Sequence, residues 1–170
     1  ECSANGCPLG DYSEFDAMNR VFKKYTADRK FCAIGSVKSN IGHSEAASGI
    51  SQLIKVVLQL VHKKIVPSIK AYPLNPDINF TETPFYLQKK SREWKSPVIN
   101  AEGEQRKLPL RAAINSFGGG GTNAHLLIEE YCPRENHREI VNYNYLSHQV
   151  IVFSAKNKQQ LQAVIKRIIE

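Results

Sequence analysis

The sequence has no hydrophobic run long enough to cross a membrane. Its most apolar stretch, residues 50–61, is interrupted by two glutamines, a serine and a lysine, whereas a membrane helix needs about 20 predominantly apolar residues. The chain also has no signal-peptide pattern and does not begin with methionine, so secretion is not indicated. We therefore expect a cytoplasmic location, and we expect that a chain beginning at Glu1 is a fragment.

Metal-binding and disulfide patterns are also missing. The cysteines are Cys2, Cys7, Cys32 and Cys132. Their spacing matches neither a zinc site, in which Cys or His pairs lie close together, nor a disulfide framework. The sequence therefore predicts no metal site and a reduced, cytosolic protein with incidental cysteines.

The net charge is positive, but its pattern is not that of a nucleic-acid binder. The chain has 23 Lys and Arg against 16 Asp and Glu, which gives a formal charge of +7. The basic residues are scattered and are not interleaved with aromatic residues. We expect no nucleic-acid binding, and an acidic protein partner fits the charge as well. Hydrophobic residues make up 42% of the 170 residues, which is enough to bury a core.

Helix patterns alternate with strand patterns along the chain, which predicts a layered α/β architecture. The expected helices are 11–25, capped by Asp11 or Ser13, then 44–63, capped by Ser44, and 157–170; the expected strands are 31–36, 85–88, 110–115, 124–129 and 149–154. The helix 44–63 begins with small residues and continues with apolar ones, so we expect it to be buried on most sides. The polar stretch 100–107 is expected to be an exposed loop.

His43 is the titratable residue that most suggests chemistry. It lies on a glycine-flanked loop immediately before a helix, where the positive end of the helix dipole favours a neutral imidazole. Such a ring can donate a hydrogen bond to a developing oxyanion or accept a proton. Lys38, on the same loop, can orient the ring or add electrostatic stabilisation. The alternative is that His43 only caps the helix and that Lys38 is solvated.

Gly118–Gly121 are four consecutive glycines between two strand patterns. Glycine runs are kept where φ must be positive or where another group must come close. The run is either a loop whose backbone amides face a substrate or a bulged turn. It is not a phosphate-binding loop, because no Gly-Lys-Ser/Thr follows. His125, in the next strand pattern, is interpreted as a core or hydrogen-bonded histidine.

Two segments resemble the ketosynthase domains of modular polyketide synthases. Residues 35–49 read GSVKSNIGHSEAASG and resemble the second-histidine motif of that family; residues 116–125 read SFGGGGTNAH and resemble its glycine-rich C-terminal motif. Between them, Pro67-Ser68, Asn75-Pro76, Pro84-Phe85-Tyr86 and Trp94 stand where the family carries similar residues. The resemblance covers about residues 1–131. The glycine-rich motif is closer to bacterial systems with free-standing acyltransferases.

This resemblance implies a thiolase-like fold of αβαβα layers, of which the chain holds only the C-terminal half. It places the ketosynthase half at 1–131, a linker at 132–148 and the start of a flanking α/β subdomain at 149–170. The family's nucleophilic cysteine belongs to an earlier segment, so an N-terminal half is an implied partner. The complete domain is implied to be a homodimer. No cofactor is expected to bind; the substrate would arrive on the phosphopantetheine of an acyl carrier protein.

The resemblance also implies roles for individual residues. His43 would stabilise the thioester oxygen as enolate charge develops, with Lys38 as its electrostatic support. The loop Phe117, Gly118, Gly119, Gly120 and Gly121 would form an oxyanion and gating loop, with the Gly119 amide as one donor. The expected supporting residues are Asn40, Glu45 and Asn123.

One position departs from the family pattern. The first-histidine motif of the family aligns with residues 1–11, ECSANGCPLGD, and its histidine falls on Ser3. A serine hydroxyl is a weaker donor than imidazole and is no useful base at neutral pH. We favour a non-elongating ketosynthase, which moves acyl chains between carrier proteins without adding carbon. The alternatives are a condensing enzyme that works despite Ser3, and a non-catalytic scaffold or docking module.

Overall fold

The computed structural model describes residues 1–69, 71–101, 103–132 and 153–169, in two compact units, Glu1–Cys132 and Pro133–Glu170. The first unit contains α1 (Pro8–Phe22), β1 (Cys32–Ile34), α2 (Lys38–Ile41), η1 (Glu45–Ala47), α3 (Ser48–His62), β2 (Lys64–Ile65), β3 (Phe85–Leu87), β4 (Arg92–Glu93), β5 (Val98–Ala101), β6 (Glu104–Lys107), β7 (Arg111–Phe117) and β8 (Asn123–Glu129). The second unit contains α4 (Lys158–Ile169). None of the described helices has the length and hydrophobicity that a bilayer crossing requires.

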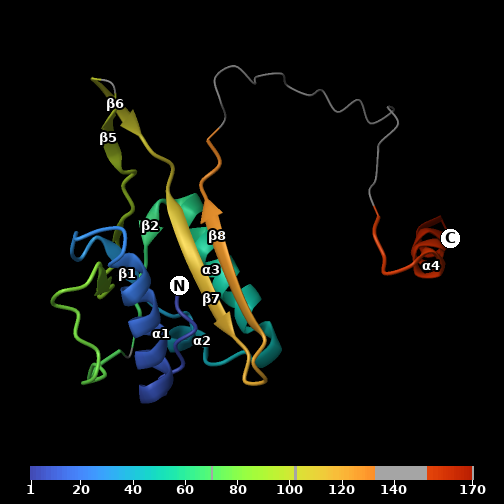
Figure 1. The fold of residues 1–170 in the computed structure, drawn as a ribbon, viewed down its shortest axis with the longest axis horizontal. Coiled ribbons are helices and arrows are strands. Elements are labelled where there is room, and N and C mark those ends of the chain that lie inside the picture. Colours follow the sequence, from blue (N-terminus) through green and yellow to red (C-terminus); the bar gives the residue numbers. More distant parts are fainter. Residues whose placement is uncertain (70, 102, 133–152, 170) are drawn as a thin grey trace. The chain divides into compact units, whose positions relative to one another are not determined.

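Two strand pairs form the framework of the first unit (Figure 1). β1 and β3 are parallel, with Cys32 opposite Phe85, and β7 and β8 are antiparallel, with Arg111 opposite Glu129. The hairpin predicted around the glycine run is thereby confirmed. A parallel pair requires a long crossover, and the chain between β1 and β3 supplies it with α3.

The segment 1–4 lies between these two pairs and joins them by backbone hydrogen bonds. On one side the Cys2 amide donates to the Gly35 carbonyl at 2.9 Å. On the other side the Glu1 nitrogen donates to the Ala113 carbonyl at 2.8 Å, and the Asn115 amide donates to the Glu1 carbonyl at 3.0 Å. The spatial order is therefore β3, β1, segment 1–4, β7, β8.

α1 and α3 cover opposite faces of these strands. Val56 and Leu60 of α3 form a buried cluster with Leu110 and with Ile114 of β7. The next residue of β7, Asn115, instead faces α1. Because neighbouring residues of a strand point to opposite faces, α1 lies on the other side of β7. There the rings of Phe15 and Phe22 pack edge-on against the Phe85 ring of β3; the centroids are 5.8 Å and 4.9 Å from that of Phe85.

Several sequence-based boundaries were wrong. α1 begins at Pro8, not at Asp11 or Ser13, and ends at Phe22. Pro at the first helical position is itself a start signal, and Asp11 is already in the first turn. The Ser44 side chain makes no capping hydrogen bond; the turn η1 precedes α3.

Two further expectations concern the polar stretch 100–107 and the C-terminal unit. The expected loop 100–107 pairs as the antiparallel hairpin β5–β6. α4 is confirmed within one residue at each end, as is the strand at 85–88. The predicted linker 132–148 and most of the predicted strand 149–154 lie outside the described residues.

α3 is not buried on most sides by the part of the chain that the structure describes. One face, Ser48, Gln52, Val56 and Leu60, is buried. The other face carries an apolar stripe, defined here as the α3 stripe, whose members are 42% to 68% exposed: Ile50, Ile54, Val57, Leu58 and Val61. The described residues of the first unit thus cover only one face of this helix.

Candidate functional site

Segment 1–4 changes its mode of bonding at Ser3. The bonds of Glu1 with Ala113 and Asn115 have the pattern of parallel strands. If this pattern continued, the Ser3 amide and carbonyl would both bond to β7. Instead the Ser3 amide donates to Oε1 of Glu14 at 2.9 Å and the Ala4 amide donates to Oε2 of the same carboxylate at 3.0 Å. Nζ of Lys38 donates to the Ser3 carbonyl. The backbone of residue 3 is therefore held by side chains from α1 and α2.

The Ser3 side chain faces the end of β7. Its Oγ accepts a hydrogen bond from the Phe117 amide at 3.3 Å. Across the hairpin, Phe117 is paired with Asn123. The structure thus brings together four of the residues that the sequence singled out, Ser3, Lys38, Phe117 and Asn123, at the start of the glycine run.

The glycine run contains two kinds of glycine. A Cβ at Gly118 would lie 2.9 Å from the Thr122 carbonyl oxygen, and Gly121 has φ +88°, so both positions require glycine for local geometry. A Cβ at Gly119 or Gly120 would meet nothing within 4 Å. The bulged-turn interpretation therefore accounts for Gly118 and Gly121. Gly119 and Gly120 are left open to another group.

His43 is oriented by its own loop. The Glu45 amide donates to Nδ1 of the ring at 3.0 Å, and Oγ of Ser48 lies 3.0 Å from the same nitrogen. Because a backbone amide can only donate, Nδ1 is an acceptor, and Nε2 carries the proton of the neutral ring. The exposed ring therefore presents an N–H donor, which is the group that an oxyanion needs.

Lys38 does not contact His43 in the way that the spacing on the loop suggested. Its ammonium group is bound to the Ser3 carbonyl, and the histidine ring is oriented by Glu45 and Ser48 instead. The exposed Asn40 accepts a hydrogen bond from the Ser39 hydroxyl at 3.1 Å. The predicted supporting residues are thus divided: Glu45 serves His43, Asn123 pairs with Phe117, and Asn40 contacts its own neighbour.

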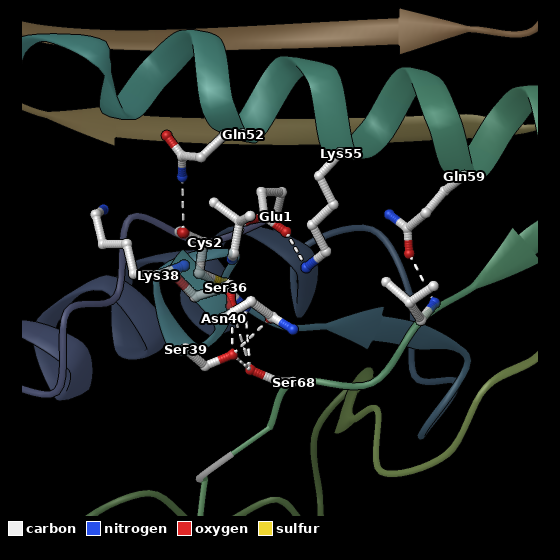
Figure 2. A network of polar contacts seen from close by, with 12 residues as sticks. Glu1, Cys2, Ser36, Lys38, Ser39, Asn40, Gln52, Lys55, Gln59 and Ser68 are labelled. Carbon is white, nitrogen blue, oxygen red and sulfur yellow. Dashed lines mark hydrogen bonds and ion pairs between the residues drawn. The ribbon is translucent and has the colours of Figure 1, made fainter. Parts of the chain in front are cut away.

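A buried ion pair lies behind the site. Oε2 of Glu1 is 2.6 Å from Nζ of Lys55 on α3, and their side chains are only 2% and 11% exposed. Oε1 of Glu1 accepts from the Val37 amide at 2.6 Å. Figure 2 shows this pair beside Ser36, Ser39 and Ser68. Together these contacts tie segment 1–4 to α3 and to the loop that leads into α2.

A second polar chain connects Ser3 to β8. Nδ2 of Asn115 donates to Glu14 at 2.8 Å, and Oδ1 of Asn115 lies 2.6 Å from Nδ1 of His125. Since the Asn115 amide donates to a carboxylate with its nitrogen, its oxygen faces the histidine, and Nδ1 of His125 is the donor. The interpretation of His125 as a hydrogen-bonded histidine is confirmed. Sequence reasoning missed Glu14 and Asn115, because no short-range pattern relates them.

The cysteines in the structure are free thiols rather than a reactive group. Cys2 is buried, and burial raises the pKa of its thiol to about 12. Burial also raises the pKa of the Cys32 thiol. A protonated thiol is a poor nucleophile. Among the described residues, no group of three or more His, Cys, Asp or Glu is placed to hold a metal ion.

A cavity of about 500 Å³ opens on the Lys38 side of Ser3. Its polar wall includes Asn5, Asp11, Glu14 and Lys38, and its apolar wall includes Met18 and Phe80. The Asp11 carboxylate accepts from the Asn5 and Gly6 amides at 3.1 Å and 3.2 Å, so it fixes this turn, which belongs to the lining of the cavity. The cavity has the size of small-molecule sites.

Comparisons with known proteins agree on one family. Residues 1–71 match the family described as "Beta-ketoacyl synthase, C-terminal domain", and residues 74–170 match "Ketoacyl-synthetase C-terminal extension". The chain is 44% identical to polyketide synthase PksL and 46% identical to PksM, both from Bacillus subtilis, over 171 aligned residues; each alignment covers 100% of this chain and 4% of the relative.

Solved structures are similar as well. The ketosynthase from module 6 of the bacillaene synthase of Bacillus subtilis has a TM-score of 0.70 and 37% identity, over 99% of this chain and 26% of that one. An oxazolomycin ketosynthase domain from Streptomyces albus has a TM-score of 0.71 and 43% identity, over 79% of this chain and 23% of that one. This chain therefore spans about a quarter of a ketosynthase structure.

Proposed function

This chain belongs to the β-ketoacyl synthase family, as the C-terminal part of a ketosynthase domain of bacterial modular polyketide synthases, and we propose that its domain transfers acyl chains without extending them. The observation that carries the proposal is Ser3. It stands where the family motif has a catalytic histidine, and its hydroxyl accepts a hydrogen bond from the Phe117 amide.

The backbone at position 3 is held by neighbouring side chains. The Glu14 carboxylate holds the amides of Ser3 and Ala4, and Lys38 holds the Ser3 carbonyl. The support for a residue at this position is therefore intact, while the imidazole is gone. Decarboxylative condensation needs charge stabilisation on the malonyl thioester from two imidazoles, and a single hydrogen bond of this kind is worth about 10²–10³ in rate.

Thioester exchange makes a smaller demand on the site. A cysteine thiol of the N-terminal half attacks the acyl thioester of a carrier-bound phosphopantetheine; the new C–S bond forms, the old one breaks, and the thiol proton ends on the pantetheine sulfur. The reverse step on a second carrier completes the transfer. The residues of this chain would supply donors to the oxyanion: the amides of the glycine run and Nε2–H of His43.

The partners follow from the same assignment. The α3 stripe fits a central helix layer of the thiolase-like fold, and we infer that the N-terminal half covers it. The phosphopantetheine belongs to an acyl carrier protein, and the positive charge of this chain, +7, suits an acidic carrier. Homodimerisation of the complete domain and a cytoplasmic location belong to the proposal.

The test uses the complete ketosynthase domain, an acyl carrier, a malonyl carrier and intact-protein mass spectrometry. We expect the wild type to gain one acyl mass on its cysteine and to leave the malonyl carrier unchanged. Ser3→His is expected to restore malonyl decarboxylation, because the support for residue 3 is present. Ser3→Ala is the control, and it should load acyl groups like the wild type.

Other outcomes would overturn the proposal. A β-keto product from the wild type would show a condensing enzyme that needs no imidazole at position 3. Failure of the wild type to acquire any acyl mass would favour the scaffold or docking module.

A further inference from the structure

Gln52 is a fully buried glutamine on α3 whose amide nitrogen bridges segment 1–4 and β7. Nε2 donates to the Cys2 carbonyl and to the Asn115 carbonyl, both at 2.8 Å. Figure 2 shows the bond from Gln52 to Cys2. Both acceptors are carbonyl oxygens, so the orientation of the side-chain amide is fixed by its partners. Neither the family motifs nor the proposed chemistry uses this residue.

The two carbonyls are those that the interrupted ladder leaves without partners. Continuation of the parallel pattern would direct the Ser3 amide to the Asn115 carbonyl and the Val37 amide to the Cys2 carbonyl. The Ser3 amide instead donates to Glu14, and the Val37 amide donates to Glu1. Gln52 therefore replaces one lost ladder bond on each side of segment 1–4.

The oxygen of the Gln52 amide makes no such contact, so the described polar contacts of this side chain are the two hydrogen bonds of its nitrogen. Oε1 of Gln52 is buried and has no hydrogen-bond partner within the described part of the chain. A buried acceptor without a partner is unfavourable. The two donors of Gln52 thus occupy the two carbonyls that a continuous ladder would use on either side of segment 1–4.

α3 also connects Gln52 to His43. Ser48 lies one turn before Gln52 on the buried face of the helix, and its Oγ is 3.0 Å from Nδ1 of His43. One helix face thus bonds to the ring of His43 and to the strands that carry Ser3 and Phe117. A shift of either contact would change the spacing of these three residues.

We propose that Gln52 is a positioning residue that holds segment 1–4 and β7 apart at Ser3, and so sets the separation of Ser3, Phe117 and His43. The inference rests on the proposed acyl transfer for its kinetic consequence. Without the two donors the ladder can close: the Ser3 amide would move from Glu14 to the Asn115 carbonyl, and the Phe117 amide would move from Ser3 Oγ to the Ser3 carbonyl.

The first test compares Gln52→Met with Val56→Ala in the complete domain. Met keeps the length of the side chain without a donor, and Val56 lies one turn further on the same buried face and makes no polar contact with the strands. A displacement of a catalytic group by about 1 Å can lower the reaction rate by about 10²-fold. We expect Gln52→Met to lower the maximal rate of acyl loading by at least about 10-fold, with the carrier concentration for half-maximal rate unchanged. Val56→Ala should change neither quantity while lowering the melting temperature.

A crystal structure of Gln52→Met gives a readout that does not depend on activity. The Ser3 amide should be within hydrogen-bond distance of the Asn115 carbonyl. If it remains on Glu14, the inference is wrong even when loading is slow. If the wild type does not load acyl groups, the proposed function fails, and this structural result still decides the role of Gln52.

A second variant, Gln52→Glu, covers the case in which Gln52→Met does not fold. A buried carboxyl group stays protonated to higher pH than usual, and its neutral form can donate to one of the two carbonyls. The loading rate of Gln52→Glu relative to wild type should therefore rise as the pH falls from 8.5 to 6. A ratio that is independent of pH, or a Gln52→Met variant that loads like Val56→Ala, would overturn the proposal.

Discussion

α1 and α3 have the same length, 15 residues, and cover opposite faces of the same strands, yet they differ in what they show to the outside. On α1 the exposed apolar residues Leu9, Tyr12 and Val21 lie toward the two ends of the helix, and the exposed pair Asp16–Arg20 at 3.1 Å lies between them. The outward face of α3 is the α3 stripe. The exposed apolar residues of α3 are therefore continuous along the helix, whereas those of α1 are not, and α3 has the composition of a helix between two layers.

The comparison distinguishes contacts that are made within this chain from the α3 stripe, which we expect the rest of the ketosynthase domain to cover. An exposed apolar stripe of this size usually marks a contact surface. Four predictions test this distinction, and they are ordered from the largest expected effect to the smallest.

The largest effect is expected from a charge on the α3 stripe. Ile54→Asp in the complete domain would place a carboxylate against the covering layer, and burying an unpaired charge costs several kcal/mol. We expect loss of soluble, folded domain in gel filtration and circular dichroism. The matched control is Ala17→Asp on the exposed face of α1, which should behave like wild type. Equal behaviour of the two variants would remove the distinction between the helices.

The next effect compares one ion pair from each helix. Lys55→Met leaves the buried Glu1 carboxylate without its partner, which should cost about 3–5 kcal/mol. Arg20→Met breaks the exposed pair with Asp16, and it should cost less than about 1 kcal/mol. The free energy of unfolding in urea measures both. Similar losses would show that burial of the Glu1–Lys55 pair does not matter.

Within the glycine run, we expect alanine to lower the stability of the domain at one position and to leave it unchanged at another. Gly118→Ala should destabilise the domain by about 1–3 kcal/mol, because the added Cβ would lie 2.9 Å from the Thr122 carbonyl oxygen. Gly120→Ala has open space within this chain and should leave the melting temperature unchanged. If Gly120 faces the acyl carrier or the N-terminal half, acyl loading will fall in Gly120→Ala at full stability.

The smallest effect concerns Cys2 at high pH. Burial raises the pKa of the Cys2 thiol in the folded protein to about 12, against an ordinary value of 9.0. The folded protein therefore keeps its full stability below pH 9. Above pH 9 the thiol ionises more readily in the unfolded chain, so the free energy of unfolding falls as the pH rises toward 12. At pH 10 the loss should be about 1 kcal/mol. Urea unfolding at pH 8 and pH 10 should show a steeper decline in wild type than in Cys2→Ala. Replacement of the exposed Cys7 by serine should not change the decline.

The sequence predicted the parts of the fold that have local signals. The α/β alternation, the hairpin around the glycine run and the helix at the C-terminus follow from periodicity and glycine placement. The thiolase-like class followed from the motifs and is confirmed by the similar ketosynthase structures. The start of α1 was misplaced because Asp11 looks like a cap, whereas its carboxylate binds the amides of the preceding turn.

The polar network around Ser3 could not be read from the sequence. Gln52 contributes two hydrogen bonds to residues 50 and 63 positions away, and Glu14 meets Asn115 across 101 positions. Gln52 is one of several polar residues of α3, and no periodic signal in the sequence distinguishes it from the others. The bond from Lys38 to the Ser3 carbonyl was missed for the same reason, because the two residues are 35 positions apart.

The first segment of the chain lies between the pairs β1–β3 and β7–β8. Residues 1–4 are bonded to the Gly35 side and to β7, and they carry the contacts of Glu1 with α3. Recombination of polyketide synthase modules joins chains of different origin at a chosen point. A junction inside residues 1–4 would exchange the segment that is bonded to both neighbouring pairs, so a hybrid synthase should keep this stretch together with residues 5–132 from the same parent.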